Sequence, residues 1–268
     1  MLVLKPYDSS LLKSAVAAVA KIIDTNAAIC YNEDGVSLYV YGKFRGLIIA
    51  TLHLLPTGFE IFDCGKPGHI YIDLTAFCEK LNMATDQEAI EISFGDIRRI
   101  KIPKGDRMII FRFKDMGTDK IRCHQMEFRK FKEVPEFAER YDDMAIGVPS
   151  QEFNRVFEEL AIPGEAAGAD DNDLLNISVN NEQLRFLRKN KEIILMKELG
   201  KYEIRGATID EPIELECSID WGRSRPCLKA AVNMTDEVLM FRSKTLGAMN
   251  YSLKCQIGKL GYLIFHII

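Results

Sequence analysis

Two short stretches carry residue types that can bind metals or move protons. The acidic run Asp170-Asp171-Asn172-Asp173 offers carboxylate oxygens of the kind that Ca²⁺ prefers, but it lacks the glycine and the closing glutamate of an EF-hand loop. Cys123 and His124 are adjacent, so they cannot easily share one tetrahedral ion. The sequence contains no GxSxG, HExxH or P-loop motif. We therefore expect no metal, no cofactor and no enzyme, and a hydrolase is the least favoured class.

Charge and cysteine content limit the classes that remain. The 268 residues include 35 basic and 39 acidic side chains, so any nucleic-acid contact must come from locally clustered positive charge. Seven cysteines without a CxxC pair fit buried, reduced thiols better than a disulfide framework. A hydrophobic content of 47% supplies a sizeable core. With no membrane-length apolar stretch and no signal-peptide pattern, a soluble intracellular protein is expected.

The elements that would position charge clusters begin with a helix near the N-terminus. Ser9-Ser10 is expected to cap it. The face of this helix opposite its apolar stripe carries small and positively charged residues: Lys13, Ala17 and Lys21. Its core stripe has apolar residues at three- and four-residue steps: Leu12, Val16, Val19 and Ile23.

Strands and a short second helix complete the first half. The turn signal Asn32-Glu33-Asp34-Gly35, flanked by β-branched and aromatic residues, predicts a hairpin. Asp73 is a plausible cap for the helix, which carries Leu74, Phe77 and Leu81 inward. The expected strands are 28–31, 36–41, 46–55, 58–64, 69–73, 89–94, 98–102, 108–113 and 121–128.

The second half repeats this plan. The interval from Ser10 to Thr75 is 65 residues, and from Ser150 to Ser218 it is 68. Ser150 is expected to cap the third helix, whose core residues are Phe153, Val156, Phe157 and Leu160. Gly222 and Pro226 predict a short or kinked fourth helix within 211–232. The expected strands are 174–179, 184–188, 192–197, 202–206, 249–256 and 262–268. The fold class is α+β: two similar domains of antiparallel sheets with two helices each.

Residues 127–149 separate the halves and fit neither a helical nor a strand period. Their aromatic residues, such as Phe128 and Phe131, argue against a floppy tether. We interpret the segment as a strap that lies on a surface, and 164–173 as a mobile loop. The predicted domains are 1–126 and 149–268, joined by a connecting loop at 127–148.

Five short motifs occur in a characteristic order: Gly-Val-Ser-Leu at 35–38, Asp-Cys-Gly at 63–65, Ile-Asp-Leu-Thr at 72–75, Pro-Ser-Gln-Glu-Phe at 149–153 and Lys-Leu-Gly-Tyr-Leu at 259–263. Each is weak alone, but together with the internal duplication they cover the whole chain. In this order and spacing the chain resembles the eukaryotic and archaeal sliding clamp family, proliferating cell nuclear antigen (PCNA). The resemblance implies three two-domain subunits closed head to tail into a ring around duplex DNA, with helices lining the hole.

The resemblance also implies partners and a place of work. Such a clamp catalyses nothing and takes no cofactor; it tethers polymerases, nucleases and ligases, which turns rebinding into an intramolecular event. Partners, including a clamp loader, would carry a Gln-x-x-aliphatic-x-x-aromatic-aromatic motif that docks beneath the interdomain loop. A nuclear homotrimer active in replication and repair is expected, without membrane contact. The alternative within the same fold is a checkpoint-type or viral subunit of a hetero-trimer.

Departures from the family pattern mark a divergent member. Gly42-Lys43-Phe44-Arg45 stands where the family usually has Asp-x-x-His, and Asp63 and Gly65 replace the outer residues of an Arg-Cys-Asp motif. The strap mixes basic and acidic residues where the family loop is mostly acidic, and the sequence ends at Ile268 without a Pro-Lys-Ile tail. These differences bear on partner choice more than on fold.

Basic residues on the helices would face DNA phosphates without reading bases. The candidates are Lys13, Lys21, Lys80, Arg155, Arg223, Arg225 and Lys229. DNA proximity is favoured for Lys13, Arg223 and Lys229, whereas the others are also compatible with ordinary solvated positions. Glu79, Glu158 and Glu159 dilute the positive face and predict a less basic hole than usual.

Two further surfaces are implied. The partner-binding candidates are Tyr41, Ile48, Phe131, Val134, Phe137, Asn250, Tyr251, Phe265 and His266. Some of these, Ile48 above all, could instead complete the cores of their own sheets. The subunit-interface candidates lie on the expected edge strands 121–128 and 192–197: Ile121, Cys123, Ile193 and Leu195. The second strand could equally be internal and buried on both faces.

Overall fold

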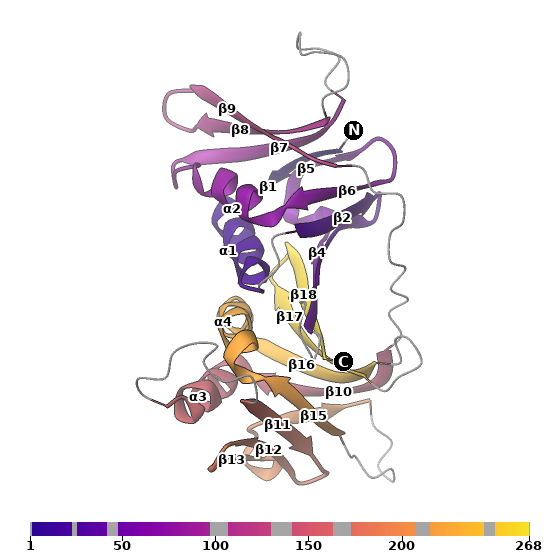
Figure 1. Cartoon of the computed structure of the whole chain (residues 1–268), viewed down its shortest axis with the longest axis vertical. Helices are drawn as coiled ribbons and strands as arrows, with labels where there is room; N and C mark the ends of the chain where they lie inside the picture. Colours follow the sequence, from indigo (N-terminus) through magenta and orange to yellow (C-terminus); the bar gives the residue numbers. More distant parts are fainter. Residues whose placement is uncertain are drawn as a thin grey trace.

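The structure is a computed structural model that describes residues 2–22, 26–41, 48–96, 107–129, 141–162, 173–206, 215–243 and 250–267. Within these ranges the chain forms two halves, one above the other in Figure 1. The first half runs β1 (Leu2–Pro6), α1 (Ser9–Ala20), β2 (Asn26–Asn32), β3 (Gly35–Tyr41), β4 (Ile48–Leu54), the 3-10 turn η1 (Pro56–Gly58), β5 (Phe59–Cys64), β6 (Gly68–Asp73), α2 (Leu74–Asn82), β7 (Glu88–Asp96), β8 (Arg107–Asp115) and β9 (Ile121–Glu127). The second runs β10 (Tyr141–Pro149), α3 (Ser150–Leu160), β11 (Leu174–Val179), β12 (Gln183–Arg188), β13 (Lys191–Met196), η2 (Lys197–Leu199), β14 (Glu203–Arg205), β15 (Leu215–Asp220), α4 (Trp221–Val232), β16 (Glu237–Ser243), β17 (Asn250–Ile257) and β18 (Gly261–Ile267).

The two halves pair their strands in the same way. In the first half β1 lies between β5 and β7, β8 lies between β7 and β9, β2 lies between β3 and β6, and β4 pairs with β3. The second half has the same pairings between strands whose numbers are higher by nine. There β10 lies between β14 and β16, β17 lies between β16 and β18, β11 lies between β12 and β15, and β13 pairs with β12. All of these pairs are antiparallel. The predicted α+β fold of two similar domains is therefore confirmed.

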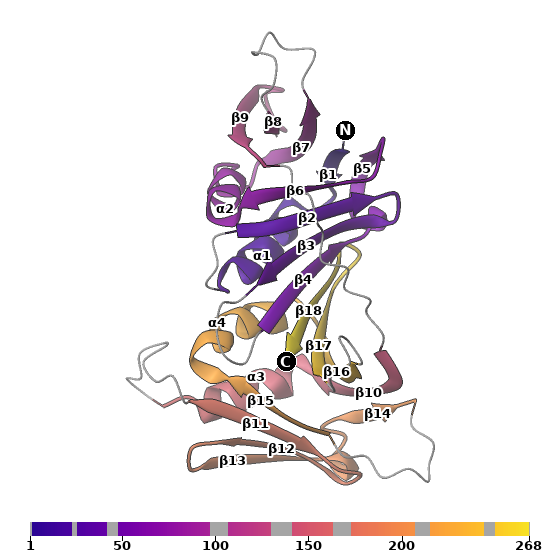
Figure 2. The same cartoon turned by 45° about the vertical axis from the view of Figure 1, so that its right-hand side comes forward.

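One strand pair joins the halves. β4 pairs with β18, from Ile48 opposite Ile267 to Leu54 opposite Gly261, so a nine-stranded sheet crosses from one half to the other. Figure 2 shows β18, in yellow, beside β4, in purple. Gly261 has a φ of 146°, and a Cβ there would lie 1.8 Å from the carbonyl oxygen of His53. Only glycine lets the two backbones approach this closely.

The four helices lie on the same side of the molecule, at the left of Figure 1. α1 packs against both α2 and α4, and α3 packs against α4. The predicted apolar stripes face inward: in α1, Leu12, Val16 and Val19 are at most 2% exposed. Their burial leaves the polar stripes of the helices on the outer side.

Helix boundaries differ from the prediction in three places. The cap of α1 is Asp8, not a serine, because its carboxylate accepts a hydrogen bond from the Leu11 N–H at 2.8 Å. α3 begins at Ser150 with Pro149 at its cap position and no side-chain cap bond. The fourth helix was expected to be short or kinked. It is not short, because it has 12 residues, as many as the first, with Pro226 inside it. Asp73 caps α2 as predicted, accepting from the Ala76 N–H at 3.0 Å.

The strap prediction was partly wrong. The end of 127–149 forms the strand β10, which pairs with β14 and β16. Its alternating apolar residues Ile146 and Val148 are fully buried. This period of two in the sequence is the pattern that indicates a strand. At the other end, Arg129 exchanges two backbone hydrogen bonds with Tyr71 of β6, at 2.7 and 2.9 Å. Residues 130–140, the predicted strand 98–102 and most of the predicted loop 164–173 lie outside the described residues. Strands β1 and β16 had not been predicted, whereas β15 is the strand of the strand-to-helix junction expected within 211–232.

Candidate functional site

The charged face of α3 is largely self-neutralised. Arg155 donates to Glu152 at 3.0 Å and to Glu159 at 2.7 Å, both about one turn away on the same helix. Lys201 also donates to Glu152, and this hydrogen bond is the main reason that the pKa of Glu152 is lowered. The surface of α3 therefore presents mixed charge rather than a basic stripe.

The two basic residues of α4 whose side chains the structure describes, Arg225 and Lys229, are also partnered. Lys229 bonds Glu158 of α3, and this bond lowers the pKa of the Glu158 carboxyl. The guanidinium of Arg225 lies 5.4 Å from the centre of the Trp221 ring. The side chain of Arg223 lies outside the described part of the chain. Because exposed ion pairs contribute little stability, a phosphate could replace Glu158 as the partner of Lys229 at small cost.

The positive charges carried by α1 and α2 lie at helix C-terminal ends, although Lys13 itself is within α1. The Lys13 ammonium donates to the carbonyl oxygen of Ala84, just beyond α2, at 2.5 Å. Lys21 is exposed at the C-terminal cap of α1, and Lys80 lies in the last turn of α2. Cations at helix C-termini interact favourably with the helix dipole, so these positions have a local structural reason as well as a proposed role at DNA.

Two sheet edges carry the candidate interface residues. β9 pairs only with β8, and β13 only with β12, among the described strands. Ile121 on β9 is 60% exposed, and Cys123 is exposed too. On β13, Ile193 is half-buried, whereas Leu195 is 1% exposed and belongs to the core. The exposed isoleucine of that strand is Ile194, at 42%. Exposed aliphatic residues on edge strands favour pairing with another chain.

The internal repeat gives these edges a register. In the β4–β18 joint, one row of paired residues crosses the sheet: Ile29, Leu38, Leu52, Leu263, Cys255 and Val238. The other two sheets each contain half of such a row. Ile177, Phe186 and Ile193 correspond to Ile29, Leu38 and Leu52, and Arg122, Phe113 and Ile90 correspond to Leu263, Cys255 and Val238. β9 and β13 are thus the counterparts of β18 and β4. If the same joint forms between two copies, Arg122 faces Ile193 and Ile121 faces Ile194.

The predicted docking residues fall into three groups. The side chains of Tyr41, Ile48, Phe131, Val134, Phe137 and Asn250 lie outside the described part. Phe265 and His266 are buried in β18, at 0% and 4% exposure, and the His266 Nδ1 lies 3.0 Å from the Ser252 hydroxyl. Tyr251 is half-buried, and its hydroxyl accepts from the Glu216 N–H at 3.4 Å. Burial makes Phe265 a core residue, whereas Tyr251 keeps accessible surface beside a polar pocket of about 500 Å³.

The acidic run ends in a buried ion pair. Arg188, 1% exposed, donates from two nitrogens to the Asp173 carboxylate and from a third to the Leu160 carbonyl at 2.7 Å. Its guanidinium lies 4.8 Å from the centre of the Trp221 ring, and Lys189 lies 3.7 Å from the same carboxylate. No group of three or more His, Cys, Asp or Glu residues in the described ranges is arranged to hold a metal ion. Asp173 therefore joins α3, β12 and α4, a role that its sequence context did not reveal.

Comparison with known proteins supports the resemblance. Residues 1–133 match the family model described as "Proliferating cell nuclear antigen, N-terminal domain". The chain belongs to the PCNA family. Curated proteins compared with the chain gave no match. The PCNA family consists of sliding clamps, which are not enzymes and which act on DNA with replication proteins. Residues 134–268 lie outside the matched range, yet they repeat its strand pairing. No helix in the described ranges is long and apolar enough to cross a membrane.

Proposed function

We propose that this PCNA-family chain is a DNA polymerase processivity clamp, in which three copies close head to tail into a ring around duplex DNA. The observation that carries the proposal is the β4–β18 joint. Each half offers the same two edges, and the chain already joins one such pair internally. The remaining pair, β9 and β13, is left for a second copy. A head-to-tail contact of this kind produces a closed ring when the rotation between copies closes.

The edge residues suit this pairing chemically. Ile121 and Ile194 would bury each other on one face of the joint, which removes two exposed aliphatic side chains from water. At the equivalent place in the internal joint, His53 and Tyr262 stack with their ring centres 4.7 Å apart. The two joints therefore use the same backbone pairing with different side chains.

Cysteine cross-linking tests the joint and its register. In a Cys123→Ser background, the double variant Ile121→Cys/Ile194→Cys should form covalent chains of two and three copies under mild oxidation. The control Met116→Cys/Ile194→Cys also carries two exposed positions, since Met116 is 69% exposed, but it should remain uncross-linked. Light scattering on the uncross-linked protein should give three times the chain mass. A monomer at all concentrations, or equal cross-linking of both variants, would refute the proposed ring, and a stable trimer disfavours the hetero-trimer alternative.

Polymerase extension tests the activity. On a singly primed circular template, the protein and a loader should lengthen the products of a cognate polymerase. A linear template, from which a ring slides off, is the control. The helix-borne basic residues are proposed to contact phosphates in a sequence-neutral way. If the protein and the loader leave the product length on the circular template unchanged, the proposed function as a processivity clamp is refuted.

Partner docking is proposed at residues 127–140 together with neighbouring strands, for peptides with the Gln-x-x-aliphatic-x-x-aromatic-aromatic motif. The family match and the half-buried Tyr251 support this placement, and the family match also supports the proposed action at replicating DNA in the nucleus. Fluorescence anisotropy of a labelled motif peptide, with its two aromatics changed to alanine as the control, measures the binding. Equal affinity for the two peptides would contradict it.

A further inference from the structure

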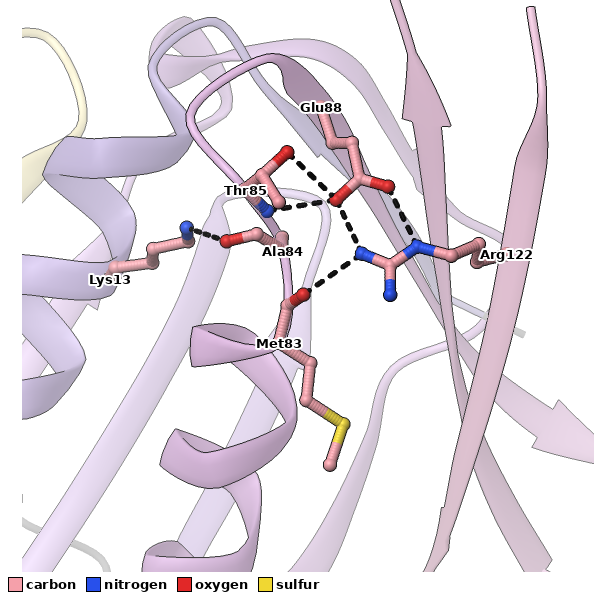
Figure 3. Close-up of polar contacts among 6 residues, drawn as sticks. All are labelled: Lys13, Met83, Ala84, Thr85, Glu88 and Arg122. Atoms are coloured by element: carbon pink, nitrogen blue, oxygen red, sulfur yellow. Dashed lines mark hydrogen bonds and ion pairs between the residues drawn. The ribbon is translucent and has the colours of Figure 1, made fainter.

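One buried carboxylate connects the turn after α2 to the open edge strand β9 (Figure 3). Glu88, which is 7% exposed, accepts from the Nε and Nη2 of Arg122 at 2.9 and 2.6 Å. It also accepts from the N–H and the hydroxyl of Thr85, at 2.8 and 3.1 Å. Arg122 donates in addition to the Met83 carbonyl at 3.0 Å. The hydrogen bonds from Arg122 are the main reason that the pKa of Glu88 falls to about 2.

The same turn is held from its other side by α1. Lys13 donates to the Ala84 carbonyl at 2.5 Å, next to the carbonyl that receives Arg122 (Figure 3). Two cations thus occupy the carbonyl groups that follow the last turn of α2, where the helix dipole favours positive charge. The turn is therefore a fixed point to which β9 is attached.

This attachment acts on a strand that, among the described strands, has a partner on one side only. β9 pairs with β8, and the residues flanking Arg122, Ile121 and Cys123, are exposed. Arg122 lies on the opposite face, where the transferred register places it against Ile193 of a second copy. An unneutralised guanidinium against an aliphatic side chain would have to lose its hydration without compensation. The bidentate bond to Glu88 supplies that compensation before any partner arrives.

We infer that Glu88 is a positioning residue for self-assembly: by fixing Arg122 it orders β9 in the conformation that accepts β13 of a second copy. The inference rests on the proposed ring and names a residue on β7, two strands away from β9, that prepares the joint. A strand ordered in advance loses less conformational entropy on binding, so assembly is tighter than contacts at the joint alone would give.

The test compares Glu88→Gln with a matched control. Glu91→Gln lies on the same strand and also removes an ion pair within the same sheet, since Glu91 accepts from Arg112 at 2.7 Å. Glu88→Gln should raise the dissociation constant of assembly, measured by analytical ultracentrifugation, by at least about tenfold, because a charge-assisted pair that preorganises the interface is lost. Glu91→Gln should stay within about twofold of the unmodified protein.

Hydrogen exchange supplies a readout that a general loss of stability would not move. At concentrations where the protein is monomeric, amides of β9 should exchange faster in Glu88→Gln, while those of β11 and β15 remain unchanged. Equal β9 exchange, or equal assembly, in Glu88→Gln and unmodified protein overturns the inference. If the unmodified protein never assembles, the proposed ring fails, and the exchange experiment still decides whether Glu88 orders β9. Should Glu88→Gln fail to fold, Arg122→Lys replaces it, because lysine keeps the charge but cannot make the bidentate bond. Unchanged assembly in that variant would also refute the inference.

Discussion

Removing the carboxylate of Asp173 should produce a large loss of stability. In Asp173→Leu, the guanidinium of Arg188 loses its carboxylate partner while it remains 1% exposed. Two charge-assisted hydrogen bonds at roughly 1.5–3 kcal/mol each give a loss of about 3–6 kcal/mol. Breaking one partner of a buried pair costs about 3–5 kcal/mol, in the same range. The Leu160 carbonyl and the Trp221 ring remain as weaker partners and keep the loss near the lower values.

The only tryptophan of the chain makes this measurable. Trp221 is 3% exposed and contacts the pair directly, so its fluorescence in a urea titration follows the region of interest. A loss of about 3–5 kcal/mol corresponds to a lowering of Tm by about 10 °C for a chain of this size. All variants are measured at one protein concentration, because any assembly of copies would shift the apparent stability.

A double variant separates the ion pair from simple disruption. Arg188→Met/Asp173→Leu removes both charges, and we expect it to recover at least half of the loss seen in Asp173→Leu. Arg112→Met, which breaks an exposed pair, should cost less than about 1 kcal/mol. The reasoning about burial is refuted if the free energy of unfolding of Asp173→Leu lies within about 1 kcal/mol of that of the unmodified protein. It is also refuted if the losses of the single variants Asp173→Leu and Arg188→Met add up to the loss of the double variant.

Three other perturbations follow from the structure. Because the pKa of Glu88 is about 2 instead of 4.5, its stabilising contribution is complete above about pH 4.5 and is lost as the pH falls toward 2; acid unfolding curves of Glu88→Gln should lack this component. Gly261→Ala would place a Cβ against the His53 carbonyl and should destabilise the chain by several kcal/mol, roughly the cost of backbone strain plus the displaced strand, so a Tm within about 2 °C of the unmodified protein would contradict it. Glu158→Gln releases Lys229 from its ion pair and should increase both the affinity for duplex DNA and its salt dependence, whereas unchanged binding argues against Lys229 as a phosphate contact.

Local periodicity predicted much of the fold because it reflects burial directly. Leu12, Val16 and Val19 lie on one face of α1, and an observer of the sequence alone can place that face inward. The strand β10 was missed because Pro149 and nearby charges obscured the alternation of Ile146 and Val148. Pairing between strands distant in the chain, such as β4 with β18, depends on three-dimensional arrangement and has no local signal.

The candidate site shows the same division. Exposed Ile121 could be proposed from its edge strand β9, whereas Leu195 on the other edge strand, β13, is buried because it points into its own domain. The bond between Glu88 and Arg122 spans 34 positions and could not be derived from composition or spacing. Charge on the helices was visible in the sequence, but the pairing of Lys229 with Glu158 required the packing of α3 on α4.

The β4–β18 joint has a consequence for the fate of incomplete assemblies. In the proposed assembly the edges β9 and β13 differ from each other, so adding a copy to an open chain always leaves one of each open, and a chain of copies never blocks its own growth. A closed ring and an open filament would then share the same contacts at every joint. The angle set at each joint, and not its affinity, decides which of the two forms. A substitution that bends the joint by a few degrees could therefore convert soluble rings into fibres without weakening any pairwise contact.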